Sequence, residues 1–239
     1  MQEKQIYSTS TIAEMTNGII LAKFEKTMMH DAGSYQSEAE LENSMISNLV
    51  SQGYERLFAK TNEDLYINLK KQIERLNDVT FSKDEWSRFL IEYLDTPNDT
   101  MIEKTGKVQE NHIYDFTFDD GHLQNIKIID KKDIHKNCLQ VVNQIKQDGS
   151  HSNRYDVTVL VNGLPLVHIE LKKRGVNLQE AFNQIHRYSK ESFNIESSLY
   201  KYVQIFVISN GTYTRYFANT LNQSKGNYEF TCEWADAKN

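Results

Sequence analysis

The sequence predicts an α/β domain in which a mixed β-sheet is flanked by helices on both faces. Three observations lead to this fold class. Hydrophobic residues recur at helical spacing before residue 96 and again after residue 177. Runs rich in Val, Ile, Thr and aromatic residues fill much of the remainder, with Asn-Gly dipeptides at 162–163 and 210–211. Two prolines and ten glycines in 239 residues, with no internal repeat, argue against a disordered or repetitive chain.

The helical segments come first along the chain. Residues 1–36 are expected to form an irregular or partly helical extension. The helix that follows is predicted to begin with a capping box of Ser37 and Glu40 and to end at Gly53. Its buried stripe is predicted to consist of Leu41, Met45, Ile46 and Leu49. The helices expected in the whole chain are 38–52, 62–77, 83–95 and 178 to about 194, with a loop at 98–106.

Strands are expected in most of the remaining segments. Residues 139–145 fit a strand or a helix, because their apolar residues follow neither period clearly. Residues 146–153 are predicted to be a polar loop, and the Asn210-Gly211 turn predicts a hairpin. The expected strands are 112–118, 126–129, 139–145, the two arms of a hairpin within 154–173, 202–209 and 212–218.

Three charged residues occupy the hairpin 154–173, whose strands should otherwise be core. Asp156 lies at the open end of the first strand, and Glu170 and Lys172 lie at the open end of the second. Glu170 and Lys172 are two residues apart, so they face the same side of the strand. A charge that faces a core is costly unless it is paired or binds a metal. These three residues are therefore candidates for a function.

The connection between the two strands decides whether Asp156 can join the other two. A regular two-residue turn at Asn162-Gly163 would send Glu170 to the face opposite Asp156. A three-residue loop over 162–164 would place the two acids directly opposite each other, and so on one face. We therefore expect an odd-length loop or a compensating bulge in this hairpin.

Two carboxylates and a lysine suit metal-dependent hydrolysis of a phosphate ester. Carboxylates are hard ligands for Mg²⁺, which takes few of them and completes its shell with waters and phosphate oxygens. The metal would activate a water and offset phosphate charge. Lys172 could orient or deprotonate that water, or stabilise the developing negative charge. The alternative is a surface ion pair on an edge strand, where Lys and Glu are common.

The segment after Gly175 is predicted to be an amphipathic helix capped by Asn177. Its core stripe is predicted to contain Leu178, Phe182 and Ile185. Gln184 and Tyr188 are i,i+4 neighbours on a second face with Ala181, so both are expected to lie away from that stripe. The same region carries a local basic excess from Lys173, Arg174 and Arg187.

These motifs together resemble a known nuclease family. Asp156, the Glu170-Leu171-Lys172 triplet and the Gln184-x-x-x-Tyr188 pair resemble the PD-(D/E)XK core with a downstream Q-x-x-x-Y motif. With the Asn162-Gly163-Leu164-Pro165-Leu166 hairpin, the chain resembles the N-terminal nuclease domain of the restriction (R) subunit of type I restriction-modification enzymes. The resemblance implies a restriction-endonuclease-like fold. It also implies that Asp156 and Glu170 bind the metal, that Lys172 is the catalytic lysine, and that Gln184 and Tyr188 support cleavage. Tyr155 stands where the family's name has a proline.

The resemblance extends toward both ends of the chain. The helix at 38–52 resembles the family's first nuclease helix, where an acid can face the metal, and Glu42 matches that acid best. Alternatively, Glu42 is a first-turn charge that the helix dipole favours. The resemblance implies a nuclease domain over 37–230 and, at 231–239, the start of a linker to an ATP-driven motor. It further implies partner modification (M) and specificity (S) subunits that use S-adenosylmethionine and read the DNA sequence.

Composition and the remaining motifs exclude several other classes. No apolar run approaches a membrane helix and no signal peptide is apparent, which suggests a single cytoplasmic domain. Cys138 and Cys232 lack the spacing of a metal site and are expected to be inert thiols. The net charge of −6 is compatible with DNA binding through a local basic rim. His168 and Glu170 match the H-x-E of zinc deaminases, but no P-C-x-x-C follows, so the zinc ligands of that class are missing. His168 shares the strand face of Glu170 and is expected to pack or to hydrogen-bond. Gly106-Lys107 is no phosphate loop.

The sequence therefore predicts a Mg²⁺-dependent endonuclease domain that cleaves double-stranded DNA within a type I restriction enzyme. The alternative is a catalytically silent module that contacts DNA and joins the motor to the methyltransferase core.

Overall fold

The computed structural model describes residues 8–13, 21–25, 36–147, 153–191, 193, 198–219 and 228–235. The chain divides into two compact units, Met1–Tyr35 and Gln36–Asn239. In the first unit, β1 (Ser8–Ala13) pairs antiparallel with β2 (Leu21–Glu25). The expectation of an irregular or partly helical segment is therefore wrong for these residues, because the Ser/Thr-rich run of β1 favours an extended chain.

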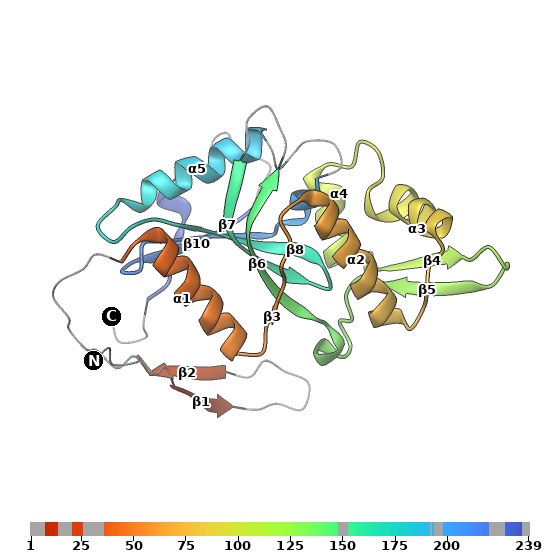
Figure 1. Ribbon diagram of the computed structural model, residues 1–239, viewed down its shortest axis with the longest axis horizontal. Helices are drawn as coiled ribbons and strands as arrows, with labels where there is room; N and C mark the ends of the chain where they lie inside the picture. The colour runs from red at the N-terminus through yellow and green to blue at the C-terminus, as the bar shows by residue number, and fades with distance from the viewer. Residues whose placement is uncertain are drawn as a thin grey trace. The chain divides into compact units, whose positions relative to one another are not determined.

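The predicted helices of the second unit are confirmed (Figure 1). Helix α1 (Glu38–Ser51) begins with the expected capping box, in which Ser37 and Glu40 each satisfy the other's backbone N–H. Helix α2 spans Asn62–Asn77, and α3 (Lys83–Phe89) continues into a π-helical turn, η1 (Leu90–Leu94). Helix α5 spans Leu178–Glu191.

Only residues 98–100 of the loop expected at 98–106 lie outside a helix, because residues 101–106 belong to α4 (Met101–Gln109). Thr100 caps it, and its side chain and that of Glu103 form a capping box. The pattern was misleading because Lys104, a polar residue in sequence, is almost fully buried and pairs with Asp95 and Asp99. A buried lysine breaks the apolar stripe from which helices are predicted.

The main sheet of the described residues has seven strands in the order β11-β10-β9-β8-β7-β6-β3. Pairs β3–β6 and β8–β9 are parallel and the others are antiparallel, so the sheet is mixed as predicted. Its strands are β3 (Glu55–Arg56), β6 (Leu139–Gln147), β7 (Asn153–Val161), β8 (Leu164–Leu171), β9 (Ile205–Ser209), β10 (Thr214–Ala218) and β11 (Cys232–Glu233).

Several strand boundaries differ from the prediction. The ambiguous segment 139–145 is strand, and the short β3 was missed. The strand expected from residue 202 begins at 205, after the 3-10 turn η3 (Leu199–Tyr202). Strands β4 (Ile113–Thr117) and β5 (Leu123–Lys127) form a separate two-stranded sheet that projects at the end of the unit away from α5 (Figure 1). Residues 148–152 of the predicted loop lie outside the described residues.

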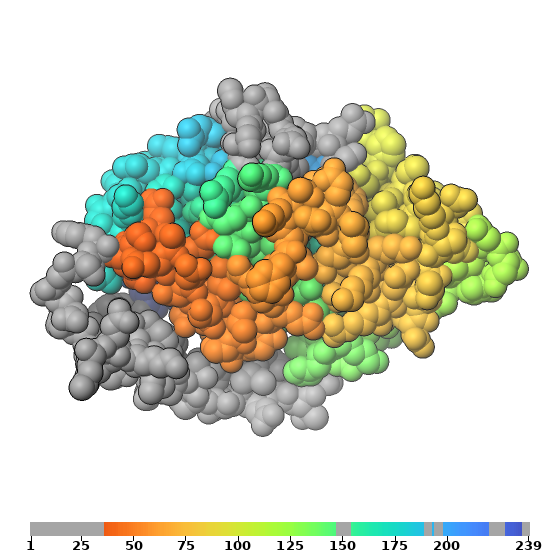
Figure 2. Space-filling model, viewed as in Figure 1, coloured from red at the N-terminus to blue at the C-terminus, as the bar shows by residue number. Residues whose placement is uncertain are grey.

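Helices cover both faces of the main sheet, as the sequence predicts. Val141 and Val142 are neighbours on β6 and point to opposite faces. Val141 belongs to a smaller hydrophobic cluster beneath α1, whereas Val142 belongs to the larger core that α2 and α5 cover. The end of β6 and the start of β7 reach the surface between α1 and α2 (Figure 2). Among the described residues, no helix has the length and apolar character needed to cross a membrane.

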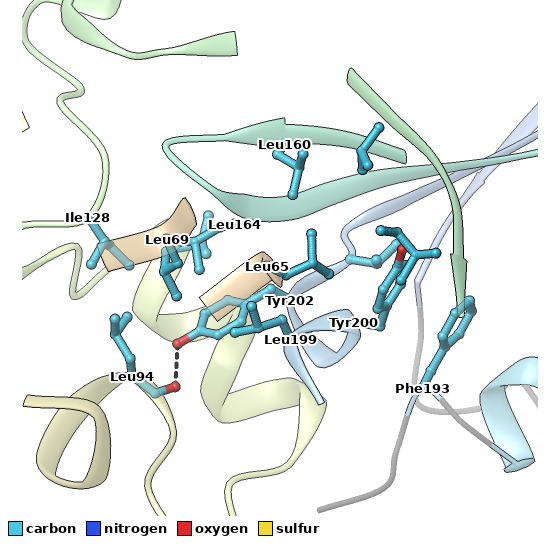
Figure 3. Packing of buried hydrophobic residues seen from close by; sticks show 14 of the residues in the cluster. Leu65, Leu69, Leu94, Ile128, Leu160, Leu164, Phe193, Leu199, Tyr200 and Tyr202 are labelled. Atoms are coloured by element: carbon cyan, nitrogen blue, oxygen red, sulfur yellow. Dashed lines mark hydrogen bonds between the residues drawn. The ribbon is translucent and has the colours of Figure 1, made fainter. Parts of the chain in front are cut away.

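The turn between β7 and β8 is locked against α2. Asn162 and Gly163 both have positive φ, 50° and 84°, as a two-residue hairpin turn requires. The buried Asn162 side chain accepts from the Cys138 N–H and donates to the Ile128 carbonyl. A Cβ at Gly163 would lie 2.7 Å from Leu69 Cα. Close to this turn, Leu164 packs beside Leu69 in the larger core (Figure 3).

Candidate active site

A β-bulge brings the two predicted acids to one place. The turn is a regular two-residue one that pairs Val161 with Leu164, so the three-residue loop was wrong. The pairing then shifts: Leu160 pairs with Pro165, whereas Val159 pairs with Val167, which leaves Leu166 as the extra residue. The compensating bulge is thereby confirmed. The last aligned pair is Val157 and Ile169, one residue short of Asp156 and Glu170. Beyond this pair the Asp156 carboxylate accepts from the N–H of Leu171, the residue after Glu170, at 2.9 Å.

Strand β7 is itself irregular at Asp156. Tyr155 and Val157 are two residues apart and would share a face in a regular strand, yet Tyr155 packs in the larger core and Val157 in the cluster beneath α1. On the neighbouring strand, Gln144 lies opposite Asp156 and has a φ of 59°. Such a conformation is strained for a residue other than glycine and is concentrated at functional sites.

The half-buried Asp156 carboxylate lies in an electrostatically unfavourable place. Burial, the neighbouring Glu170 carboxylate and, to a smaller extent, Glu42 raise the pKa of Asp156 to about 7. Two interactions oppose this rise: the Leu171 N–H donates to Oδ2 at 2.9 Å, and the Lys172 ammonium is nearby. A site that crowds carboxylates in this way favours the binding of a cation.

Lys172 connects Glu170 to helix α5. The Glu170 side chain is fully buried, and its Oε1 accepts from Lys172 Nζ at 3.0 Å. The same ammonium donates to Gln184 Oε1 at 2.7 Å. Gln184 Nε2 donates to the Tyr188 hydroxyl, which in turn donates to the Arg154 carbonyl at 3.2 Å. The structure thus brings Glu170, Lys172, Gln184 and Tyr188 into one hydrogen-bonded chain.

Tyr188 lies away from the predicted core stripe of α5 but is nevertheless buried. It is only 5 % exposed and its ring belongs to the larger core. The ring lies 5.0 Å from that of Tyr155, edge to face. The helical period placed Tyr188 off the stripe of Leu178, Phe182 and Ile185 correctly, but the rings of Tyr155 and Phe193 pack against it on this second face. Burial raises the pKa of the Tyr188 hydroxyl, so it remains a neutral donor.

Glu42 enters the site from α1. It is 7 % exposed, and its two carboxylate oxygens accept from the side chains of Asn143 and Gln144. Arg56 in turn donates to Asn143 Oδ1. Both oxygens are therefore held by neutral amide donors, which fix the charge beside Asp156. The alternative of a first-turn charge favoured by the helix dipole is wrong, because the acids in the first turn of α1 are Glu38 and Glu40.

Asn143, Gln144 and Arg56 were missed from sequence. Asn143 and Gln144 lie in a segment whose strand or helix character was ambiguous, and the left-handed conformation of a glutamine has no sequence signal. The polar Asn-Gln pair inside the otherwise apolar run 141–145 was the available clue. A polar pair inside a core strand needs partners.

The donor set fits a hard divalent cation. Within the described ranges, no group of three or more His, Cys, Asp and Glu residues is arranged to hold a metal. Mg²⁺ does not require one, because it binds through one or two carboxylates and keeps waters or phosphate oxygens for the rest. Asp156 and Glu170 supply two carboxylates, and Glu170 Oε2 is buried without a hydrogen-bond partner among the described residues.

Exposed basic residues neighbour the candidate site residues along the chain. Arg154 lies near the start of β7, immediately before the Tyr155–Asp156 irregularity, and is exposed. Lys173 and Arg174 follow the last strand residue and are exposed, as is Arg187 on α5. The expected local basic excess therefore faces solvent, where a phosphate backbone can be contacted.

Comparison with known proteins identifies the family of the chain. Residues 35–225 match the family described as type I restriction enzyme R protein N terminus. The chain belongs to this family. Among its relatives, the EcoprrI endonuclease subunit of Escherichia coli is 53% identical over 232 residues, which cover 97% of this chain and 74% of the relative. The SauMSSORF170P endonuclease subunit of Staphylococcus aureus strain MSSA476 is 35% identical over 215 residues, 86% of this chain and 22% of that subunit.

The family membership is therefore confirmed, together with the R-subunit N-terminal character of the chain. The relatives are named as type I restriction enzyme endonuclease subunits. The chain spans about three quarters of the E. coli relative but about a fifth of the S. aureus one.

Proposed function

We propose that this chain is the Mg²⁺-dependent nuclease domain that cuts double-stranded DNA in a type I restriction enzyme. The observation that carries the proposal is the convergence of Asp156, Glu170 and Lys172. Asp156 Oδ2 accepts from the N–H of Leu171, which lies between the other two residues, and Lys172 Nζ lies 3.0 Å from Glu170 Oε1. Family membership supports the same activity.

In this proposal Asp156 and Glu170 hold the metal ion. When bound, Mg²⁺ lowers the pKa of a coordinated water and offsets charge on the scissile phosphate. Burial of Glu170 keeps bulk water from competing for its oxygens. The crowding that raises the pKa of Asp156 would be relieved by the cation, so binding and carboxylate ionisation favour each other.

Lys172 acts on the reacting water or on the phosphate. Its ammonium is fixed by Glu170 and Gln184, which leaves one of its three N–H donors for a ligand. That donor can orient the attacking water or stabilise the negative charge that develops on phosphate oxygen. Gln184 is itself held by Tyr188, so this pair positions the lysine.

The exposed Arg154, Lys173, Arg174 and Arg187 would contact the DNA backbone without reading its sequence. In the intact enzyme we place an ATP-driven motor outside this chain. We assign sequence recognition and the use of S-adenosylmethionine to the partner S and M subunits.

The test is made in the full-length subunit assembled with its M and S partners. Asp156→Ala and Lys172→Ala should each abolish DNA cutting while ATP hydrolysis and assembly persist, because the chemistry of cutting lies here and the motor does not. Lys132→Ala, at an exposed lysine outside the site, is the matched control and should cut normally. If both site variants cut DNA at the parental rate, the catalytically silent docking role takes the place of this proposal. Parallel loss of ATP hydrolysis would also contradict it.

A further inference from the structure

His168 is buried without a conventional hydrogen bond. It lies on β8 two residues before Glu170, is 0 % exposed, and neither ring nitrogen has a hydrogen-bond partner among the described residues. Aromatic rings enclose it, from Tyr155, Tyr188, Phe193, Tyr200 and Phe206. A buried polar group without a partner is costly, and each one in a folded protein calls for an explanation.

Glu170 is the polar neighbour that the structure gives to His168. His168 Nε2 lies 3.4 Å from Glu170 Oε2, slightly beyond an ordinary N–H···O hydrogen bond. That same oxygen is the one atom of the Glu170 carboxylate that is buried without a partner in the described structure. Two unsatisfied atoms of complementary character therefore face each other within the site.

Other polar groups around the imidazole are already engaged. Thr158 lies directly opposite His168 in the hairpin, but its hydroxyl is paired with that of Tyr200 at 3.0 Å. The Tyr188 hydroxyl is shared between Gln184 and the Arg154 carbonyl. A histidine that served only to fill space would be replaced without loss by an apolar side chain of similar size.

We propose that His168 is a positioning residue for Glu170, an inference that rests on the proposed nuclease function. Its Nε2–H donates to Oε2, while Lys172 holds Oε1 from the other side. The carboxylate is thereby fixed between two donors and cannot rotate. Each carboxylate oxygen has two lone pairs, so both oxygens can accept these bonds and still have a lone pair for a cation. Outer hydrogen bonds of this kind orient metal-binding carboxylates.

Two substitutions separate donation from packing. In the full-length subunit assembled with its partners, His168→Gln keeps an N–H donor at a similar reach, and His168→Met fills similar volume without one. Binding of Mn²⁺ is measured by titration without ATP, and the site is identified as the one lost in Asp156→Ala. The Met variant should bind Mn²⁺ 10- to 100-fold more weakly, about the usual effect of removing such a partner. It should also require more Mg²⁺ for half-maximal cutting, whereas the Gln variant should stay within about threefold of the parent on the same scale.

Parental Mn²⁺ binding by a folded Met variant would overturn the inference. Equal losses of Mn²⁺ affinity in the Met and Gln variants would also overturn it, because they would show that His168 acts through packing. If Asp156→Ala retained cutting and every Mn²⁺ site, the proposed function would itself be wrong. If Asp156→Ala is inactive and the Met variant is normal, the role of His168 alone is wrong. A crystal structure of the unsubstituted subunit with Mn²⁺ tests the inference without any variant. His168 Nε2 should lie within about 3.2 Å of Glu170 Oε2, and a different partner for Nε2 would refute the proposal.

Discussion

Replacing Asp156 by asparagine should stabilise the metal-free protein at neutral and higher pH while removing its metal site. Burial and the Glu170 charge raise the pKa of Asp156 from 3.8 to about 7. This rise sets an upper limit of about 4 kcal/mol, because each tenfold change in proton affinity is worth about 1.4 kcal/mol. The position is only half-buried, so screening by solvent reduces the expected gain to about 2 kcal/mol. Asparagine can still accept the Leu171 N–H that Asp156 accepts.

The sign of the pH dependence follows from the raised pKa. Between about pH 4 and pH 7 the folded protein keeps a proton on Asp156 that the unfolded chain has released. Stability of the unsubstituted protein therefore falls with rising pH through this window, and the Asn variant loses this contribution. The two proteins should unfold at similar urea concentrations near pH 4 and diverge toward pH 8.

The measurement is urea unfolding of the 239-residue chain in a chelator, at several pH values. Glu110→Gln, at an exposed residue at the end of α4, removes the same charge outside the site and should show no such divergence. The electrostatic reasoning is wrong if the Asp156 variant and its parent differ in free energy of unfolding by the same amount at pH 4 and at pH 8. Addition of Mg²⁺ should stabilise the parent and leave the variant unchanged.

Three further substitutions test other parts of the structure. Gly163→Ala should lower the free energy of unfolding in urea by about 3–4 kcal/mol, because it combines a left-handed φ with a clash against the backbone of Leu69. Its control, Gly121→Ala, has a similar φ in open space and should lower it by about 1–2 kcal/mol. Equal losses in the two variants would contradict the clash at Gly163. Tyr188→Phe should lower DNA cutting and cost about 1–2 kcal/mol, because the hydrogen bonds of the Tyr188 hydroxyl with Gln184 and with the Arg154 carbonyl are lost. Parental cutting would exclude the hydroxyl from the site. Gln144→Gly relieves a strained φ and removes a donor to Glu42, so stability should change little while cutting falls. Unchanged cutting by this last variant would leave Gln144 with a structural role only.

Local patterns predicted the elements that frame the site. Asn162-Gly163 gave a hairpin because both residues tolerate positive φ, and the Ser37–Glu40 capping box fixed the start of α1. The two-residue turn that Asn162-Gly163 favours would by itself place Asp156 and Glu170 on opposite faces. A shared face for the two acids therefore required an odd-length loop or a bulge. The sequence could not distinguish these two, because a three-residue loop and a bulge produce the same parity. The bulge at Leu166 accompanies a tight turn that is fixed by Asn162 hydrogen bonds to distant residues.

Features that depend on contacts between distant segments could not be predicted in this way. Tyr188 is buried because Tyr155 and Phe193 pack against it, and neither belongs to its helix stripe. Lys104 is buried because two aspartates from the segment before α4 surround its ammonium. In both cases a polar or amphipathic side chain has an environment that only the assembled fold creates.

The irregularity at Asp156 explains how acids from both faces of the sheet reach one site. In a regular strand, Glu42 on α1 would lie across the sheet from Glu170, whose neighbours His168 and Tyr188 belong to the opposite face. The left-handed Gln144 and the reversal between Tyr155 and Val157 interrupt the β6–β7 ladder where Asp156 stands. Asp156 therefore lies near enough to both acids for each to raise its pKa. A more regular ladder would stabilise the sheet but separate these charges, so we infer that strain here is retained because it assembles the site.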